Sequence, residues 1–280
     1  MNKYDTLIAS TTQEMIEHHL GEKIVRVMPL QGGLSNRCML LEFVTFSAVW
    51  RPVAKASEAF AVSRLHESQV LRQLRQQAFA PNVLLLSDEG LLVEWLAGEV
   101  HQTPAELHAI MALQAKIHQC AAPLHTLDIH DKALQYWNAI APVDKQADLT
   151  MLFDGFQQTP LPYSFALTCC HFDLGYYNII RCDDQMDAVI DWEYAAAGDP
   201  SLDLAMTIQA NGYECEEAVR AYCLARGDEN IEQWQNAVIA WQPWCDYLTM
   251  LWYFAGAQVW QDESYRSQGK KLLNQLLLLR

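Results

Sequence analysis

Short apolar runs separated by polar breaks characterise the N-terminal segment, residues 1–96. The runs "KIVRVMPL", "CMLLEFV" and "SAVWRPV" are rich in branched and aromatic side chains, which favour strands. The polar break "QGGLSNR" separates the first two runs, and "NVLLLSDEGLLVEWLAG" predicts two further strands that turn at residues 88–90. We therefore expect a sheet of short antiparallel strands in this segment.

Helical spacing interrupts the strand pattern twice. A first helix is predicted from Thr11 to Leu20, because Thr11 and Glu14 have the spacing of a capping box and Gly21 follows the last turn. Apolar residues then recur near helical spacing across residues 57–79, with a serine as the N-cap. This second pattern predicts one amphipathic helix.

Helical periodicity dominates the remainder of the chain, residues 97–280. The exception is "ALTCCHFDLGYYNIIRCDDQMDAVIDWEYA", which predicts short strands and turns around Asp183 and Asp184. A strand-rich segment followed by a larger helical one indicates an α+β protein of two lobes with a cleft between them. We place the join near "EWLAGE", so that the domains are 1–96 and 97–280.

The chain is acidic, with a formal net charge of −15 over 280 residues and an isoelectric point near 4.9. This charge opposes binding to nucleic acid or to anionic lipid, and it favours a small cationic partner. Acidity also serves solubility alone in many cytoplasmic proteins, so both explanations stay open. The sequence indicates no obligate protein partner.

Eight cysteines lie scattered through apolar segments without a Cys-x-x-Cys pair or zinc-finger spacing, which is typical of reduced core residues. The N-terminal "MNKYDTLIASTTQEM" lacks the features of a signal peptide, and no apolar run approaches the roughly 20 residues of a membrane span. We expect a cytoplasmic protein that binds neither nucleic acid nor a membrane.

Polar residues gather in "CHFDLGYYNII" and in "VIDWEYA", beside apolar strand-like runs. Taken singly, Asp173, Asn178 and Asp191 are ordinary turn or cap residues. Taken together they suit phosphoryl transfer, in which one Asp accepts the proton of the substrate hydroxyl while an Asn and a second Asp hold Mg²⁺. His171 is expected to organise the loop rather than to act as a base.

The run "HFDLGYYN" followed by "VIDWEYAAAGDPSLDLA" resembles the signature of the aminoglycoside phosphotransferase and choline kinase superfamily, which has a protein-kinase-like fold. The resemblance continues upstream through "GGLSNR", "WRPV", "HESQVLRQL" and "VEWLAGEV", in the same order. It implies ATP and Mg²⁺ as cofactors, Asp173 as catalytic base, and Asn178 and Asp191 as metal ligands. It also implies that Asp203 braces the catalytic loop without being a catalyst.

The same resemblance implies a nucleotide site in the N-terminal lobe. Arg51 takes the place of the basic residue on the third strand, with Lys55 as a competitor and Glu67 as its ion-pair partner. The loop over the phosphates would contain Gly32, Gly33, Ser35 and Asn36. The hinge whose backbone reads the adenine edge would be Glu94, Trp95 and Leu96.

Aromatic residues are dense near the C-terminus. Most of them are expected in the core, but a few rings beside Glu193 could attract a cation through cation–π contacts. The candidates for this substrate pocket, beside Asp173 and Glu193, are Trp241, Trp244, Trp252 and Tyr253. Together with "IDWEYAAAGD", this segment most resembles bacterial thiamine kinases, with choline kinases next.

We therefore expect an ATP-dependent kinase of the primary alcohol of a small cation, with thiamine first. Choline or ethanolamine and aminoglycosides are the alternative acceptors, and a non-catalytic ligand-binding module is the alternative of another class. The intact set of Asp173, Asn178 and Asp191 argues against the silent module. The sequence leaves open the oligomeric state and the choice between ATP and GTP.

Overall fold

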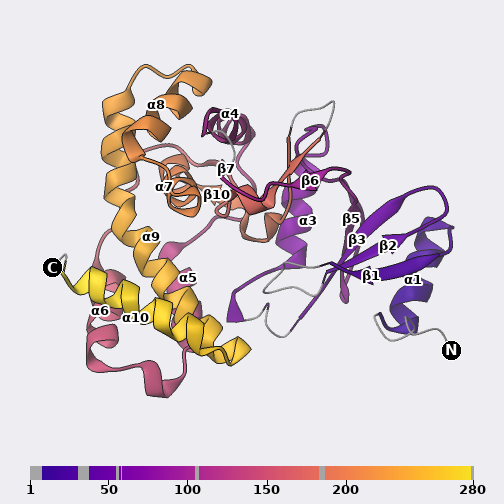
Figure 1. Ribbon diagram of the computed structural model, residues 1–280, viewed down its shortest axis with the longest axis horizontal. Helices are drawn as coiled ribbons and strands as arrows, with labels where there is room; N and C mark the ends of the chain where they lie inside the picture. The colour runs from indigo at the N-terminus through magenta and orange to yellow at the C-terminus, as the bar shows by residue number, and fades with distance from the viewer. Residues whose placement is uncertain are drawn as a thin grey trace. The chain divides into compact units, whose positions relative to one another are not determined.

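The computed structural model describes residues 8–30, 38–54, 57, 59–104, 107–182 and 187–278 (Figure 1). The chain forms two compact units. The first contains Met1–Glu58, Val62–Val100 and Asn178–Glu193, and the second contains Ala59–Ala61, His101–Tyr177 and Tyr194–Arg280. The N-terminal antiparallel sheet and the many helices that follow it make this an α+β protein, as the sequence predicts.

A five-stranded antiparallel sheet forms the centre of the first unit, in the order β1-β2-β3-β5-β4. The strands are β1 (Arg26–Pro29), β2 (Met39–Glu42), β3 (Ser47–Pro52), β4 (Val83–Ser87) and β5 (Gly90–Glu94). All five coincide with the apolar runs of the sequence. Trp50 on β3 pairs with Met39 and Leu92, and these side chains belong to the buried core of the sheet.

The helix α1 (Ser10–Leu20) ends at Gly21, whose φ of 70° is the left-handed conformation that the sequence predicts there. The predicted capping box at its start is wrong. The helix begins after Ala9, without a side-chain cap, so that Thr11 lies inside the first turn. The neighbouring Thr12 is buried, and its hydroxyl donates a hydrogen bond to Glu89.

The prediction of one helix across residues 57–79 is also wrong. The helix α3 (Arg64–Gln73) is shorter and has a serine N-cap, Ser63, whose hydroxyl accepts a hydrogen bond from the backbone N–H of His66. Upstream, Ala61 has a φ of 53°, which no continuous right-handed helix allows. Apolar spacing carries no signal for a break of this kind.

A small antiparallel sheet in the first unit contains β6 (Glu99–Val100), β8 (Ile179–Arg181) and β9 (Ala188–Val189). Gly98 makes the approach of β6 possible, because a Cβ there would lie 2.3 Å from the carbonyl oxygen of Arg181. Its φ of 148° is likewise unfavourable for other residues. Asp183 and Asp184, around which the sequence predicts a turn, lie outside the described residues.

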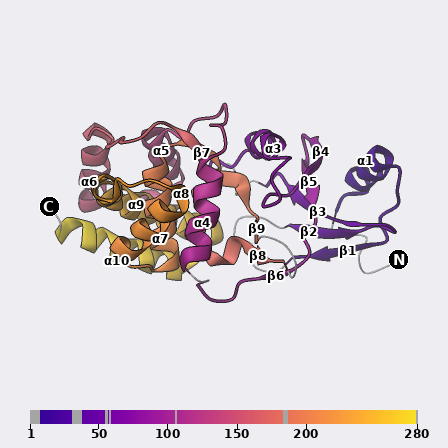
Figure 2. The same cartoon turned by 90° about the horizontal axis from the view of Figure 1, so that it is seen from above.

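The second unit is mostly helical. Its helices are α4 (Leu107–His118), α5 (Ile129–Ala139), α6 (Ala147–Gln158), α7 (Pro200–Asn211), α8 (Cys215–Arg226), α9 (Ile231–Trp260) and α10 (Glu263–Leu278). The long helix α9 packs against α7 and α8 along one half and against α5 and α10 along the other (Figure 1). The helix α4 packs against α8 (Figure 2).

One short two-stranded sheet, β7 (Thr168–Cys170) with β10 (Ala196–Gly198), lies among these helices. Its strands flank the segments that carry the predicted chemistry, because His171 follows β7 directly and α7 begins directly after β10. Across the described ranges, no helix combines the length and the apolar character that crossing a bilayer requires.

Candidate active site

The first unit contains a buried cluster of charged side chains around Arg51 on β3. Nε of Arg51 lies 2.8 Å from Oε1 of Glu67 on α3, so the two side chains form an ion pair. The geometry does not meet the criteria of a hydrogen bond, and Nε has no hydrogen-bond partner among the described residues. The two side chains are 9% and 2% exposed. Burial opposes the charge of Arg51, but the carboxylates of Glu67 and Asp191 outweigh it and raise the pKa of the guanidinium. The predicted ion pair is therefore present, and Lys55 lies outside the described residues.

Among the described residues, two guanidinium groups and three carboxylates form the cluster. Arg51 also contacts Asp191 and lies 3.2 Å from Glu193, while Arg64 contacts Glu67 at 2.6 Å and Glu193 at 3.2 Å. Each guanidinium group thus faces at least two carboxylates. Burial and the neighbouring Asp191 carboxylate raise the pKa of Glu193 to about 7.

The pairing of β8 with β9 brings Asn178 beside the residues that precede Asp191. Ile179 pairs with Val189, and the backbone N–H of Ile190 donates to the carbonyl oxygen of Asn178 at 2.9 Å. Asp191 has a φ of 64°, a costly backbone conformation for a residue other than glycine, and its side chain is 28% exposed. Amide and carboxylate oxygens at the same end of a hairpin are ligands that Mg²⁺ accepts.

The second unit contains the loop of Asp173, which follows β7. Its start is fixed by Asp203 on α7, which accepts hydrogen bonds from the backbone N–H groups of Phe172 at 2.6 Å and of His171 at 3.3 Å. Phe172 has a φ of 63°, and its ring lies against Gly198, where a Cβ would come within 2.3 Å of the ring. The interpretation of Asp203 as a brace for this loop fits these contacts.

Asp203 is fully buried and accepts two further hydrogen bonds. Nε2 of His118 lies 2.8 Å from the carboxylate and Nε2 of Gln114 lies 3.2 Å from it. Burial alone would raise the pKa of Asp203, but the hydrogen bond and the electrostatic interaction with His118 outweigh it and hold the pKa below its usual value.

His171 organises the loop through its ring. The backbone N–H of Asp173 donates to Nδ1 of His171 at 3.2 Å, and the His171 side chain is fully buried. A ring nitrogen that accepts a hydrogen bond carries no proton. The geometry therefore agrees with a role as loop organiser.

Two residues that the sequence did not single out also hold this loop. The side chain of Asn211, at the end of α7, accepts from the backbone N–H of Tyr176 and donates to the carbonyl oxygen of Leu174, each at 2.9 Å. Asp203, Thr207 and Asn211 recur every four residues along α7, and such a polar stripe in an apolar helix is the signal that could have identified Asn211. Tyr177 contacts Asp173 through its hydroxyl.

The other predicted nucleotide residues lie at the edge of the described structure or outside it. Glu94 ends β5, and the backbone N–H of Trp95 donates to the carbonyl oxygen of Ser47 at 3.3 Å. Leu96 follows, and it is half-buried like Glu94 and Trp95. The predicted phosphate loop, with Gly32, Gly33, Ser35 and Asn36, lies outside the described residues.

The aromatic candidates on α9 differ in their accessibility. Trp241 and Trp244 are buried in the core of the second unit, whereas Trp252 and Tyr253 are half-buried and pack together with ring centroids 5.3 Å apart. Glu193 belongs to the first unit. The structure thus leaves Trp252 and Tyr253, unlike Trp241 and Trp244, partly exposed to solvent.

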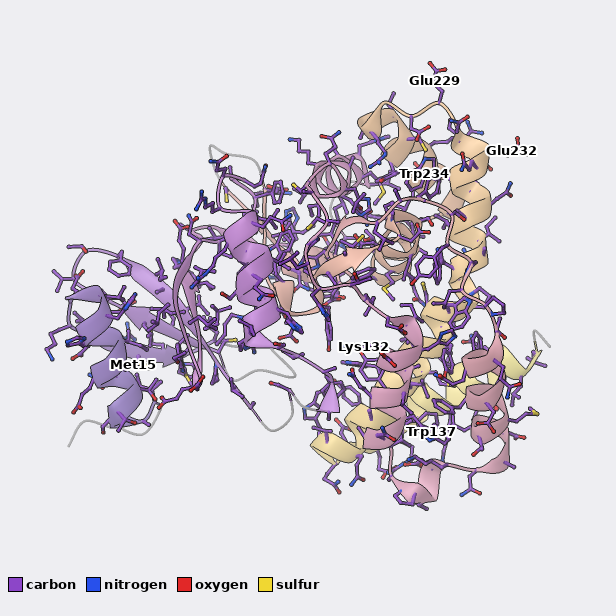
Figure 3. The ribbon with its side chains drawn as sticks, turned by 180° about the vertical axis from the view of Figure 1, so that it is seen from behind. Met15, Lys132, Trp137, Glu229, Glu232 and Trp234 are labelled. Carbon is purple, nitrogen blue, oxygen red and sulfur yellow. The ribbon has the colours of Figure 1, made fainter. Side chains whose placement is uncertain are left out.

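Lys132 on α5, which Figure 3 labels, makes cation–π contacts with two aromatic rings. Its Nζ donates to the carbonyl oxygen of Phe60 at 2.6 Å, and it lies 4.5 Å from the ring centroid of Tyr194 and 5.2 Å from that of Tyr136. A second cation at those two rings would meet the charge of Lys132. A cationic ligand is therefore disfavoured at the rings of Tyr136 and Tyr194.

Comparisons with known proteins agree with this geometry. The model of the phosphotransferase enzyme family matches residues 26–237. Thiamine kinase of Salmonella paratyphi B is 24% identical over 189 residues, which are 68% of each chain.

Two solved structures share the fold. The choline kinase LicA of Streptococcus pneumoniae superimposes with a TM-score of 0.74 at 16% identity, covering 95% of this chain and 98% of its own. The GDP and kanamycin complex of APH(2")-IIia gives a TM-score of 0.64 at 17% identity, covering 97% and 100%. The family match spans both the arginine cluster and the Asp173 loop, and we conclude that the chain belongs to the phosphotransferase enzyme family and is a small-molecule kinase.

Proposed function

We propose that this kinase transfers the γ-phosphoryl group of ATP to the primary alcohol of a small cation, with thiamine as the first candidate. The observation that carries the proposal is the Asp173 loop, which a buried carboxylate, a buried imidazole and a buried amide hold at successive backbone groups. A short loop held by this many buried polar side chains is typical of a catalytic segment, where reacting groups must be held in a fixed orientation.

In the proposed reaction, Asp173 orients the acceptor alcohol and accepts its proton as the oxygen attacks the γ-phosphorus. His171 and Asp203 fix the backbone on either side of Phe172, so that the carboxylate keeps one position. Phosphoryl transfer needs little covalent help from the protein, and positioning together with charge stabilisation supplies most of the catalysis.

Asn178 and Asp191 are the proposed ligands of Mg²⁺, which would neutralise the phosphate charge when it is bound. The oxygen donors of these two side chains suit this ion. We propose that Arg51 and the loop with Gly32, Gly33, Ser35 and Asn36 hold the phosphates. Glu67 would orient Arg51 through their ion pair.

We further propose that backbone groups of Glu94, Trp95 and Leu96 bind the adenine edge. The acidic chain, the thiamine kinase relative and the accessible rings of Trp252 and Tyr253 support a cationic acceptor. The choline kinase and the kanamycin complex among the solved structures make choline and an aminoglycoside the alternatives. A thiazolium ring would lie flat on an aromatic face, which cation–π attraction favours by about 0.5 to 2 kcal/mol per contact.

The direct test is phosphate transfer from ATP, with Mg²⁺ present, to thiamine, choline, ethanolamine and kanamycin. The product is identified by mass spectrometry and the rate is followed by ADP release. Thiamine monophosphate as the main product would support the first choice. If no acceptor is phosphorylated while one of them binds tightly, the binding-module alternative is correct instead.

The role of Asp173 is tested by D173N, with D148N as a matched control because Asp148 is an exposed acid at the start of α6 in the same unit. We expect D173N to lower kcat by roughly 10² to 10⁴, as for loss of a general base, with ATP affinity changed by less than about twofold. D148N should retain the rate of the parent protein. Normal turnover by D173N would remove Asp173 from the mechanism.

A further inference from the structure

The hydroxyl of Tyr177 donates a hydrogen bond to Oδ1 of Asp173 across 2.7 Å. The side chain of Tyr177 is 43% exposed, so its hydroxyl could equally well be hydrated. Both residues belong to the second unit. The contact therefore places a neutral donor on the carboxylate that is the proposed base.

The local backbone produces this contact. Between the two residues, the N–H of Gly175 donates to the carbonyl oxygen of Asp173 at 2.9 Å, which turns the chain back on itself. A Cβ at Gly175 would lie 2.2 Å from Cε1 and 2.3 Å from Cζ of Tyr177. The ring thus lies directly against the glycine, and any larger residue at position 175 would displace it.

The loop cannot relax to break the contact at low cost. Asn211 holds the carbonyl oxygen of Leu174 and the N–H of Tyr176, the residues on both sides of Gly175. The ring of Tyr177 also meets the ring of Tyr176 edge to face, with centroids 5.5 Å apart. Backbone and ring are therefore held independently of the hydrogen bond itself.

A hydroxyl donor has two effects on a carboxylate. It selects one side-chain orientation, and it stabilises the ionised form relative to the protonated form. A carboxylate accepts through several lone pairs, so a donor at Oδ1 is compatible with a second bond to an acceptor alcohol. Both effects would serve a group that must receive a proton in a defined direction.

We propose that Tyr177 is a positioning residue for phosphoryl transfer, which fixes the orientation of Asp173 and keeps its carboxylate ready to accept the proton of the substrate alcohol. This inference rests on the proposed function of Asp173. Tyr177 itself does not exchange a proton with the substrate. The ring of Tyr177 occupies the space that a side chain at position 175 would need, so Gly175 is required for the same contact.

The test compares Y177F and G175A with Y163F, in which a tyrosine of similar exposure, 48%, loses its hydroxyl elsewhere in the second unit. We expect Y177F to lower kcat about three- to tenfold, with the KM for ATP nearly unchanged. The acid limb of the rate profile over roughly pH 5 to 9 should move to higher pH. G175A should have the same effects, and Y163F neither.

A double variant separates the hydrogen bond from general damage to the loop. If G175A acts by displacing the Tyr177 ring, it should lower kcat much less in the Y177F background than in the parent protein. Additive losses would mean that Gly175 acts on something other than this ring. They would overturn its part in the inference.

A readout besides turnover is the titration of the Asp173 carboxyl, followed by carbon-13 NMR with D173N for assignment. In Y177F this titration should move to higher pH. If the parent protein phosphorylates no acceptor, the proposed function fails and the inference fails with it, whereas in an active parent protein this titration tests the inference alone. Unchanged titration and pH profile in Y177F would refute it, and so would higher activity, which would mean that the hydroxyl obstructs the base.

Discussion

The buried carboxylate of Asp203 gives the sharpest prediction about stability. In D203N one carboxylate oxygen becomes an NH₂ group, which cannot accept a hydrogen bond. Oδ1 of Asp203 accepts from the N–H of Phe172, and Oδ2 accepts from the N–H of His171 and the side chains of His118 and Gln114. The amide should therefore turn its NH₂ toward Phe172, where it costs the fewest bonds.

That arrangement leaves the N–H of Phe172 buried and unpaired, which costs about 1 to 3 kcal/mol. The three remaining bonds lose the strength that a charged acceptor gives them, about 1 kcal/mol or more in total. We expect D203N to lower the free energy of unfolding by about 2 to 4 kcal/mol at neutral pH. Because Phe172 precedes Asp173, kcat should fall as well.

Urea unfolding followed by circular dichroism measures this loss, with D148N as the control that should change stability by less than about 0.5 kcal/mol. The lowered pKa of Asp203 also fixes the direction in which stability changes with pH. A carboxyl whose folded-state pKa is depressed stabilises the fold above its unfolded pKa, and this contribution disappears as the pH falls through the folded value. D203N should therefore lose less stability on acidification than the parent protein. A loss below about 1 kcal/mol at neutral pH would refute the account of Asp203 as the anchor of the loop.

Three further predictions concern the first unit. Gly98→Ala should destabilise it by about 2 kcal/mol or more in urea, because the new methyl group meets the carbonyl oxygen of Arg181; a neutral effect would show that β6 can shift. Burial raises the pKa of Glu193 to about 7, so the folded state binds an extra proton and stability should fall as the pH rises from about 4.5 to 7. In E193Q the fall in the free energy of unfolding over this pH range should be smaller by about 1 to 3 kcal/mol. If the fall is equally steep in E193Q, another group causes it. D191N should raise the Mg²⁺ concentration for half-maximal activity about tenfold or more, and an unchanged requirement would exclude Asp191 as a ligand.

The sequence predicted the strands of the first unit well because their signal is local. Each of the five is a run of branched and aromatic residues bounded by polar breaks, and a sheet buries such runs wherever they pair. The ion pair of Arg51 with Glu67 was predicted by resemblance, and the structure contains it. The second arginine of the cluster is Arg64. The sequence could have indicated it, because it lies three residues before Glu67 on the same helix.

The errors arose where a distant contact outweighed a local preference. Thr11 and Glu14 have the spacing of a capping box, yet the helix begins earlier and the adjacent Thr12 bonds to Glu89, far along the chain. Ala61 gave no warning of its left-handed backbone, because alanine usually favours helix. Asn211 binds a loop that lies far before it in the sequence, so the polar stripe along α7, rather than local propensity, is the signal that points to this residue.

Asp203 and Asn211 lie two turns apart on α7, and they hold the beginning and the end of the same short loop. This helix therefore acts as a ruler for the loop, since the spacing of its two polar side chains sets the span between Phe172 and Tyr176. Because both side chains hold the loop, any tilt or translation of α7 would move Asp173 together with the helix.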